Sequence, residues 1–319
     1  MCSMSYKSAM NSKLLRCRLL RLVMLILSGG LASTVSAGEP SPVKVCVTTG
    51  MIADLVRQVG GDHVEVMQLM GPGIDPHLYK PTSSDASALG KADVVFYNGL
   101  MLEGRMGELF DRLSKSGKNI HALTDSIPKD RLISAPDFKD HHDPHVWFDV
   151  DLWRQTVPTI VKGLSAADPE GRAIYEKNAA DLDTRLVALH AWCLAQSATL
   201  PEAARILVTS HDAYNYFGRA YGFRVVGLQG ASTVSEAALA DVASLVDFIR
   251  DQNVKAIFVE SSVNPTAIQR VAADAGVVVG GELFSDAMGM PGEVMNGYDT
   301  GTYDGMVRHN LSTIIEALK

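Results

Sequence analysis

Four side chains that can bind a metal ion stand in short motifs far apart in the sequence. They are His77 in DPHLY, His145 in DPHVWF, His211 in TSHDAY and Asp286 in LFSDAM, and they are separated by 68, 66 and 75 residues. Finger-type zinc sites use ligands only a few residues apart, so a site made of these four would have to be assembled by the whole fold. Three neutral imidazoles and one carboxylate form a ligand set that suits first-row divalent ions.

Further acids and histidines lie near these motifs. A metal-binding imidazole usually donates its second N–H to a carboxylate, and the aspartates close enough in sequence to accept it are Asp75, Asp143, Asp149 and Asp212. The sequence leaves open which of them does so. His141 and His142 could capture a metal ion transiently, but a solvated loop is the preferred interpretation. Because the imidazoles must be neutral to bind, affinity is expected to fall below about pH 6.

Strands that alternate with helices position the four motifs. This pattern predicts an α/β fold with parallel sheets flanked by helices. His77 and His211 each follow a predicted strand, and Asp286 follows the strand Val277–Val279 and a turn at Gly280-Gly281. Ligands of open α/β sheets bind beyond the carboxyl ends of the strands. The strands are predicted at Val43–Thr48, Val64–Met70, Val94–Tyr97, Arg205–Thr209, Arg224–Leu228, Ala256–Val259 and Val277–Val279, and helices at Met51–Val59, Ser83–Leu89, Leu239–Gln252 and Pro265–Ala275.

One segment interrupts this alternation. Residues 169–197 contain no strand signal, and their apolar residues keep a helical spacing. A helix of this length would run about 40 Å. We interpret it as a backbone helix joining two α/β lobes. The predicted division is a signal peptide at 1–37, an N-terminal lobe at 38–168, the linking helix at 169–198 and a C-terminal lobe at 199–319, with two candidate ligands in each lobe.

The N-terminal segment has the features of a secretory signal. Residues 1–37 contain five basic residues and no acidic one, then a short apolar run, then Val35-Ser36-Ala37 before the predicted cleavage site. The alternative is a permanent membrane anchor, although the apolar run is short for a span. Without this segment the chain has 24 basic and 36 acidic residues, a net charge of −12. An exported acidic protein is a poor partner for nucleic acid or for anionic membrane surfaces.

Two cysteines remain after the predicted cleavage, Cys46 and Cys193. Export permits a disulfide between them. Cys46 lies in a strand pattern and Cys193 in a helical pattern, so we expect two buried thiols instead. Two cysteines this far apart form no zinc motif.

Several longer motifs resemble one family along essentially the whole predicted mature chain. They are DPHLYKPTSSD, DPHVWFD, VTSHDAYNYFGRAYGF, GLQGASTVSEA, IFVESS and GGELFSDAMG. The chain resembles the ZnuA/TroA-like metal-binding solute receptors (cluster A-I) of zinc and manganese ABC importers, and most of all the TroA branch. The resemblance implies two lobes joined by a long helix, one metal between them, and ligand roles for His77, His145, His211 and Asp286.

The resemblance also implies a function. The expected protein is a periplasmic receptor that binds Zn²⁺, or alternatively Mn²⁺, as transported cargo in the cleft between the lobes. It would deliver the ion to an ABC permease in the inner membrane and act as a monomer without chemistry. A secreted zinc hydrolase is the main alternative, but four protein ligands would close the coordination sphere and no HExxH motif is present. A surface adhesin is a third possibility.

Overall fold

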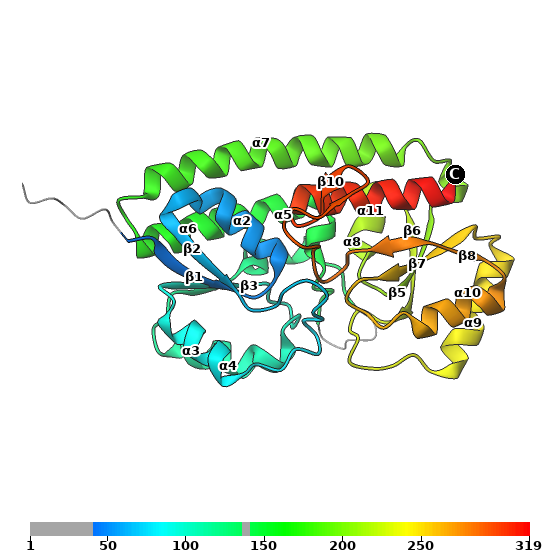
Figure 1. The fold of residues 1–319 in the computed structure, drawn as a ribbon, viewed down its shortest axis with the longest axis horizontal. Coiled ribbons are helices and arrows are strands. Elements are labelled where there is room, and N and C mark those ends of the chain that lie inside the picture. The colour runs from blue at the N-terminus through cyan, green and yellow to red at the C-terminus, as the bar shows by residue number, and fades with distance from the viewer. Residues whose placement is uncertain (1–40, 136–140) are drawn as a thin grey trace, which may run out of the picture. The chain divides into compact units, whose positions relative to one another are not determined.

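The computed structural model describes residues 41–135 and 141–319, so the predicted signal peptide at 1–37 lies outside the described residues. From Pro42 to Lys319 the chain forms one compact unit. The fold is α/β with parallel sheets flanked by helices, as the strand and helix alternation predicts (Figure 1). None of the helices in the described residues has both the length and the apolar run that a membrane span requires.

The N-terminal half contains a four-stranded parallel sheet with the strand order β2-β1-β3-β4. Helices α2 and α6 pack on one face, while α3 and α4 lie along the other (Figure 1). The strands alternate between these faces: Val45 and Val47 join the core under α2, whereas Cys46 joins the smaller core on the opposite side. The elements are β1 (Val43–Val47), α2 (Gly50–Gly60), β2 (Val64–Gln68), α3 (Ser83–Lys91), β3 (Val94–Tyr97), α4 (Gly107–Lys115), β4 (Ile120–Ala122), α5 (Val150–Trp153) and α6 (Val157–Ala167).

The C-terminal half pairs its strands in parallel as β5 with β6 and β7 with β8, and β5 packs beside β7. Helices α9 and α10 share a core with these strands, and α11 packs on β8. A short antiparallel pair, β9 with β10, precedes α11. The elements are β5 (Ile206–His211), α8 (Asn215–Tyr221), β6 (Arg224–Gln229), α9 (Leu239–Asp251), β7 (Ala256–Glu260), α10 (Thr266–Ala275), β8 (Val278–Leu283), β9 (Val294–Met295), β10 (Tyr298–Asp299) and α11 (Tyr303–Leu318).

The predicted turn at Gly280-Gly281 is wrong, because both glycines lie inside β8. The register between β7 and β8 shifts there, so that Ile257 pairs with Val279 and Phe258 with Gly281. Gly280 is the extra residue of this bulge. A Cβ at Gly280 would come within 2.6 Å of the Cβ of Ala317 on α11. Glycine therefore allows α11 to pack closely against the strand that leads to Asp286.

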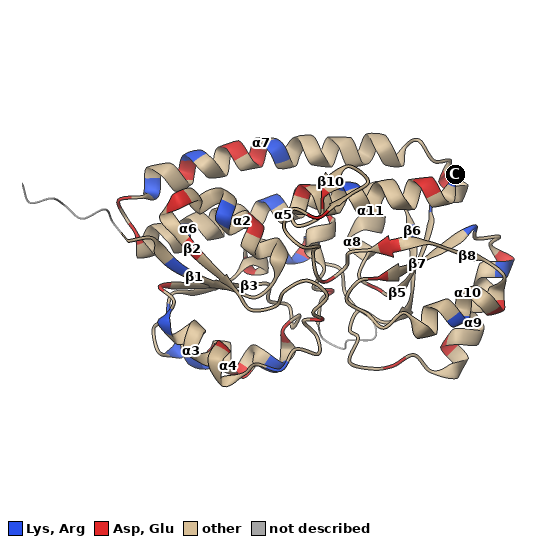
Figure 2. Ribbon diagram, in the orientation of Figure 1, with Lys and Arg blue, Asp and Glu red and all other residues tan. Residues whose placement is uncertain are grey.

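The long helix is α7 (Arg172–Ser197), with 26 residues, and it confirms the predicted backbone helix. It packs against α2 and α6 of the N-terminal half and against α11 of the C-terminal half (Figure 1). All its Lys, Arg, Asp and Glu residues lie between Arg172 and Arg185, and the rest of the helix carries none, as Figure 2 shows. Near its start, Tyr175 is buried, whereas Ile174 is 40% exposed.

One hydrophobic cluster runs through both halves of the molecule. It contains strand residues of β1 and β3, the buried face of α7, and residues of β5, β7 and α11. Across the halves, the ring of Phe148 stacks on that of Tyr214 with centroids 4.1 Å apart. The two halves share this core. The domain boundaries at 168 and 199 stay a prediction.

Candidate metal centre

The fold brings the four predicted residues together. His77 lies on the loop after β2, His145 directly before a short 3₁₀ turn, His211 at the end of β5, and Asp286 just after β8. One ligand atom from each lies within 4.8 Å of the other three, and all four residues are buried. His211 and Asp286 lie at the carboxyl ends of the parallel strands β5 and β8, as the general rule for α/β sheets predicts.

Four of the six distances between the four groups fall in a narrow range. The Nε2 atom of His145 lies 3.3 Å from that of His77 and 3.4 Å from that of His211. The two oxygens of Asp286 lie 3.2 Å from His145 Nε2 and 3.3 Å from His211 Nε2. A tetrahedron with metal–nitrogen bonds of 2.0–2.1 Å has edges of about 3.3 Å. These four edges therefore have the length expected in a tetrahedral zinc site, and all four ligand atoms lie within 4.8 Å of one another.

Two of the imidazoles are held by carboxylates behind them. His145 Nδ1 lies 2.7 Å from Asp143 Oδ1, and His211 Nδ1 lies 2.6 Å from Glu260 Oε2. The Asp143 hydrogen bond fixes His145 Nδ1 as a proton donor, and the ion-pair contact with Glu260 favours a proton on His211 Nδ1. In the neutral imidazoles the lone pair of Nε2 then faces the centre. Both oxygens of Asp286 are buried without a hydrogen-bond partner among the described residues. Lone pairs and a carboxylate that face one another call for a cation between them.

Of the four aspartates that could accept an imidazole N–H, Asp143 is hydrogen-bonded to the ring of a predicted ligand, His145. Asp75 accepts the backbone N–H of His77, Asp149 caps α5, and Asp212 accepts the backbone N–H of Gly227. The partner of His211 is Glu260, at the end of β7, which sequence reasoning missed. The available signal was that an acid directly follows the apolar run Ala256–Val259, the next parallel strand to β5.

The three histidines differ strongly in their electrostatic environment. Burial lowers the pKa of His77 to about 3. Burial also opposes the charge of His145, but Asp143 and Asp286 outweigh it and raise its pKa to about 9. In the same way Glu260 and Asp286 overcome burial and hold the pKa of His211 well above its usual value. Burial alone would raise the pKa of Asp286. The neighbouring imidazoles of His211 and His145 outweigh burial and hold this pKa well below its usual range.

The segment that carries His145 is bonded to both halves of the molecule. Its Pro144 carbonyl accepts a hydrogen bond from Asn98 in the N-terminal half. On the other side, Trp147 Nε1 donates to the carbonyl of Ser285, and Tyr216 donates to that of Asp143. His145 is thus fixed against His211 and Asp286 by side chains that surround it, and does not belong to the N-terminal lobe alone.

The fold and the buried site are those of a solute receptor, which carries a small ion without transforming it. The chain belongs to the family whose model is described as zinc-uptake complex component A, periplasmic, which matches residues 45–317. This family is one of receptors and not of enzymes, so the hydrolase alternative has no support.

Similar proteins cover nearly the same length. The manganese-binding lipoprotein MntA of Bacillus subtilis (strain 168) is 45% identical over 293 residues, which is 90% of this chain and 94% of the relative. The zinc-binding protein TroA of Treponema pallidum is 42% identical over 288 residues, 89% of this chain and 91% of the relative. The solved structure of periplasmic TroA from Treponema pallidum has a TM-score of 0.83 and 41% identity, covering 87% of this chain and 99% of that one. The predicted resemblance is confirmed.

Proposed function

We propose that this protein is the solute-binding receptor of a metal ABC importer and that His77, His145, His211 and Asp286 are the ligands of its cargo. The observation that supports this most directly is that four of the six distances between the facing ligand atoms are 3.2–3.4 Å. These lengths fit the edges of a tetrahedron around Zn²⁺. The general affinity order also favours zinc over manganese for nitrogen-rich sites. Zn²⁺ is therefore the first choice of cargo and Mn²⁺ the second.

The relatives support both ions, because one is named for manganese and another for zinc. Manganese prefers more ligands than four. A carboxylate that bound through both oxygens would supply one of them, and Asp286 is the residue placed to do so. The choice between the ions therefore depends on how Asp286 coordinates.

The family description supports a place outside the cytoplasmic membrane. We assign the protein to the periplasm, with residues 1–37 as the signal peptide that exports it. It would act as a monomer that hands its ion to a membrane permease, without nucleic acid as a partner. We keep the division into lobes at 38–168 and 199–319 with the linking helix at 169–198.

Competitive titration of the chain from Gly38 onward with Zn²⁺ and Mn²⁺ tests this function. One ion per chain should bind, with Zn²⁺ the tighter of the two, and His145→Ala should lose at least a hundredfold in affinity. His63→Ala is a matched control, since His63 lies by Asp168, away from the four ligands. Binding of several ions per chain, or equal loss in both variants, would refute the assignment.

A further inference from the structure

A hydrogen bond between the two halves holds the loop that carries His77. Asp75 uses Oδ1 to accept the backbone N–H of His77 at 2.8 Å. Its other oxygen, Oδ2, accepts the hydroxyl of Thr233 at 2.6 Å. Thr233 lies in the loop between β6 and α9, more than 150 residues further along the chain, and is 7% exposed. The pair therefore joins the first metal motif to the C-terminal half.

The second Asp-Pro-His motif uses its aspartate in the same way. Asp143 Oδ1 accepts the backbone N–H of His145 at 2.9 Å, and Asp143 Oδ2 accepts the amide of Asn215 at 3.1 Å. Asn215 begins α8, in the C-terminal half. In both motifs, one carboxylate oxygen orders the histidine backbone and the other binds the C-terminal half. Thr233 therefore binds the aspartate of the His77 motif in the same way that Asn215 binds the aspartate of the His145 motif.

His77 has the weaker support of the two. His145 has the carboxylate of Asp143 at its Nδ1 atom. Within the described residues, neither ring nitrogen of His77 forms an ion pair with a carboxylate. Its ring meets those of His145 and His211, with centroids 5.4 and 6.0 Å away. The position of His77 thus depends on its backbone, and the backbone depends on Asp75.

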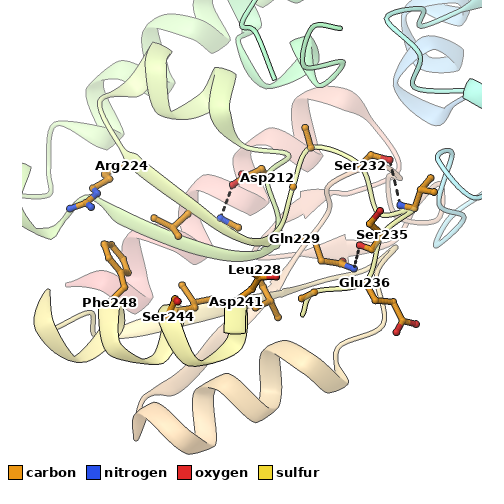
Figure 3. Close-up of a pocket in the computed structure, with 17 residues that line it drawn as sticks. Asp212, Arg224, Leu228, Gln229, Ser232, Ser235, Glu236, Asp241, Ser244 and Phe248 are labelled. Atoms are coloured by element: carbon orange, nitrogen blue, oxygen red, sulfur yellow. Dashed lines mark hydrogen bonds between the residues drawn. The ribbon is translucent and has the colours of Figure 1, made fainter. Parts of the chain in front are cut away.

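The loop that carries Thr233 is itself held to strand β6 of the C-terminal half. Gln229, the last residue of β6, donates from Nε2 to the carbonyl of Ser235 at 3.1 Å, which ties the loop to the strand (Figure 3). Asp212, the neighbour of His211, accepts the backbone N–H of Gly227 in the same strand at 2.6 Å (Figure 3). The loop that holds Thr233 is therefore connected to the strand pair that carries His211.

The outer side of this loop is open. Ser232, Val234 and Ser235 line a cavity of about 710 Å³ between β6, the loop and α9. Figure 3 shows Ser232, Ser235 and Glu236 on the loop, with Asp241 and Phe248 of α9 across the cavity. Side chains do not fill this space, so packing from outside does not press Thr233 onto Asp75. The hydrogen bond is therefore a direct tie between the two segments.

From these contacts we infer that Thr233 is a positioning residue of the metal site. Through Asp75, its hydroxyl holds the His77 loop to the C-terminal half and slows the loss of the bound ion. The inference rests on the proposed function. Removing the hydroxyl leaves a largely buried carboxylate oxygen without its donor, which should speed metal release by about tenfold or more. The effect belongs in the dissociation rate, because the contact forms only when both loops are in place.

The test compares Thr233→Val and Thr233→Ala, which lack the hydroxyl, with Thr233→Ser, which keeps it. Zn²⁺ release into excess chelator is followed by stopped flow, and the visible spectrum of the Co²⁺ form reports the ligand geometry. We expect faster release and an altered Co²⁺ spectrum in the first two variants, and near wild-type behaviour in the serine variant. Thr184→Val on α7, whose hydroxyl bonds only the carbonyl of Ala180 among the described residues, is the matched control.

A double-mutant cycle with Asp75→Ala decides whether Thr233 acts through Asp75. In that background, Thr233→Val should not accelerate release further. Equal acceleration in both backgrounds, or wild-type release in Thr233→Val, would overturn the inference while leaving the receptor function intact. Failure of the wild-type chain to bind Zn²⁺ or Mn²⁺ would instead overturn the proposed function, and the inference with it.

Discussion

At the scale of single residues, the site combines three histidines with unlike proton affinities. His77 has a pKa of about 3, His145 of about 9, and His211 well above its usual value. Asp143 and Glu260 produce the difference, because each places a carboxylate behind one imidazole, whereas His77 has no ion pair with a carboxylate among residues 41–135 and 141–319. The raised pKa values favour protons on His145 and His211 in the metal-free site, and the lowered pKa favours a neutral His77. An incoming ion has to displace those two protons.

This competition predicts a steep dependence of affinity on pH. The raised pKa values stabilise the protonated, metal-free site below about pH 9, so affinity rises with pH up to that value. Between pH 6 and 8, release of two protons per ion corresponds to about a hundredfold in affinity per pH unit. The sequence alone suggested a fall only below about pH 6, since it did not reveal the carboxylates. Zn²⁺ titration at several pH values measures the slope, and a slope near zero in this range would contradict the assignment.

Glu260→Gln tests the support of His211. The amide keeps the size of the side chain but loses the charge that orients the imidazole and makes it a stronger ligand. Loss of such a supporting carboxylate commonly weakens binding by about 10- to 100-fold. The pH dependence should also become shallower, because the pKa of His211 would fall. Glu202→Gln, in the short turn before β5, is the control and should bind as the wild type does.

At the scale of elements, the strands place the ligands and the helices fix the strands. His211 ends β5, Glu260 ends β7, and Asp286 follows β8, so neighbouring parallel strands deliver three functional groups to one edge. The hydrophobic patterns were sufficient to predict these strands. The helix predicted at Ser83–Leu89 is α3, and it is capped by Thr82, whose side chain accepts from the backbone N–H of Asp85 while the Asp85 side chain accepts from the backbone N–H of Thr82.

Other elements could not be predicted because their signals are not local. β4 has only three residues, and it is ordered by pairing with β3. The bulge at Gly280 resembles a turn in sequence, and only the approach of α11 explains the two glycines. The contact between Asp75 and Thr233 spans 158 residues, so no pattern in either segment indicates it.

Gly280→Ala tests the packing of α11 on β8. The new Cβ would lie 2.6 Å from Ala317 Cβ and 2.9 Å from Phe258 Cε1, so the helix or the strand must shift. Overpacking of this kind costs about 1–3 kcal/mol of unfolding free energy. Gly90→Ala in α3 is the control, because its Cβ would meet nothing within 4 Å and alanine favours a helix. Urea unfolding measures both, and equal stability of the two variants would argue against the close approach.

At the scale of the whole molecule, one large core is common to the two halves, and each half has a smaller core besides. The main hydrophobic cluster passes from β1 through the buried face of α7 to β5, β7 and α11. Phe148 and Tyr214 meet inside it, one from each half. A receptor built in this way has little freedom to swing its halves apart, so its changes on binding should be local ones in the loops around the ion.

The shared core predicts a single cooperative unfolding transition. Urea curves from far-ultraviolet circular dichroism and from tryptophan fluorescence should coincide. Phe148→Ala should lower the unfolding free energy by about 3–5 kcal/mol without splitting the transition. Two separate transitions in the wild type would mean that the halves fold independently. Val187→Ala, on an exposed part of α7, is a control expected to change stability little.

The raised pKa values of His145 and His211 have a consequence for how a transporter could recognise this receptor. If His145 and His211 each give up one proton when a divalent ion enters, the loaded and the metal-free molecules carry the same net charge. Long-range attraction depends on net charge and its distribution, and so would be nearly equal for both forms. We therefore expect a permease to meet both forms at similar rates and to tell them apart only on contact, by the shape that the loops around the ion adopt.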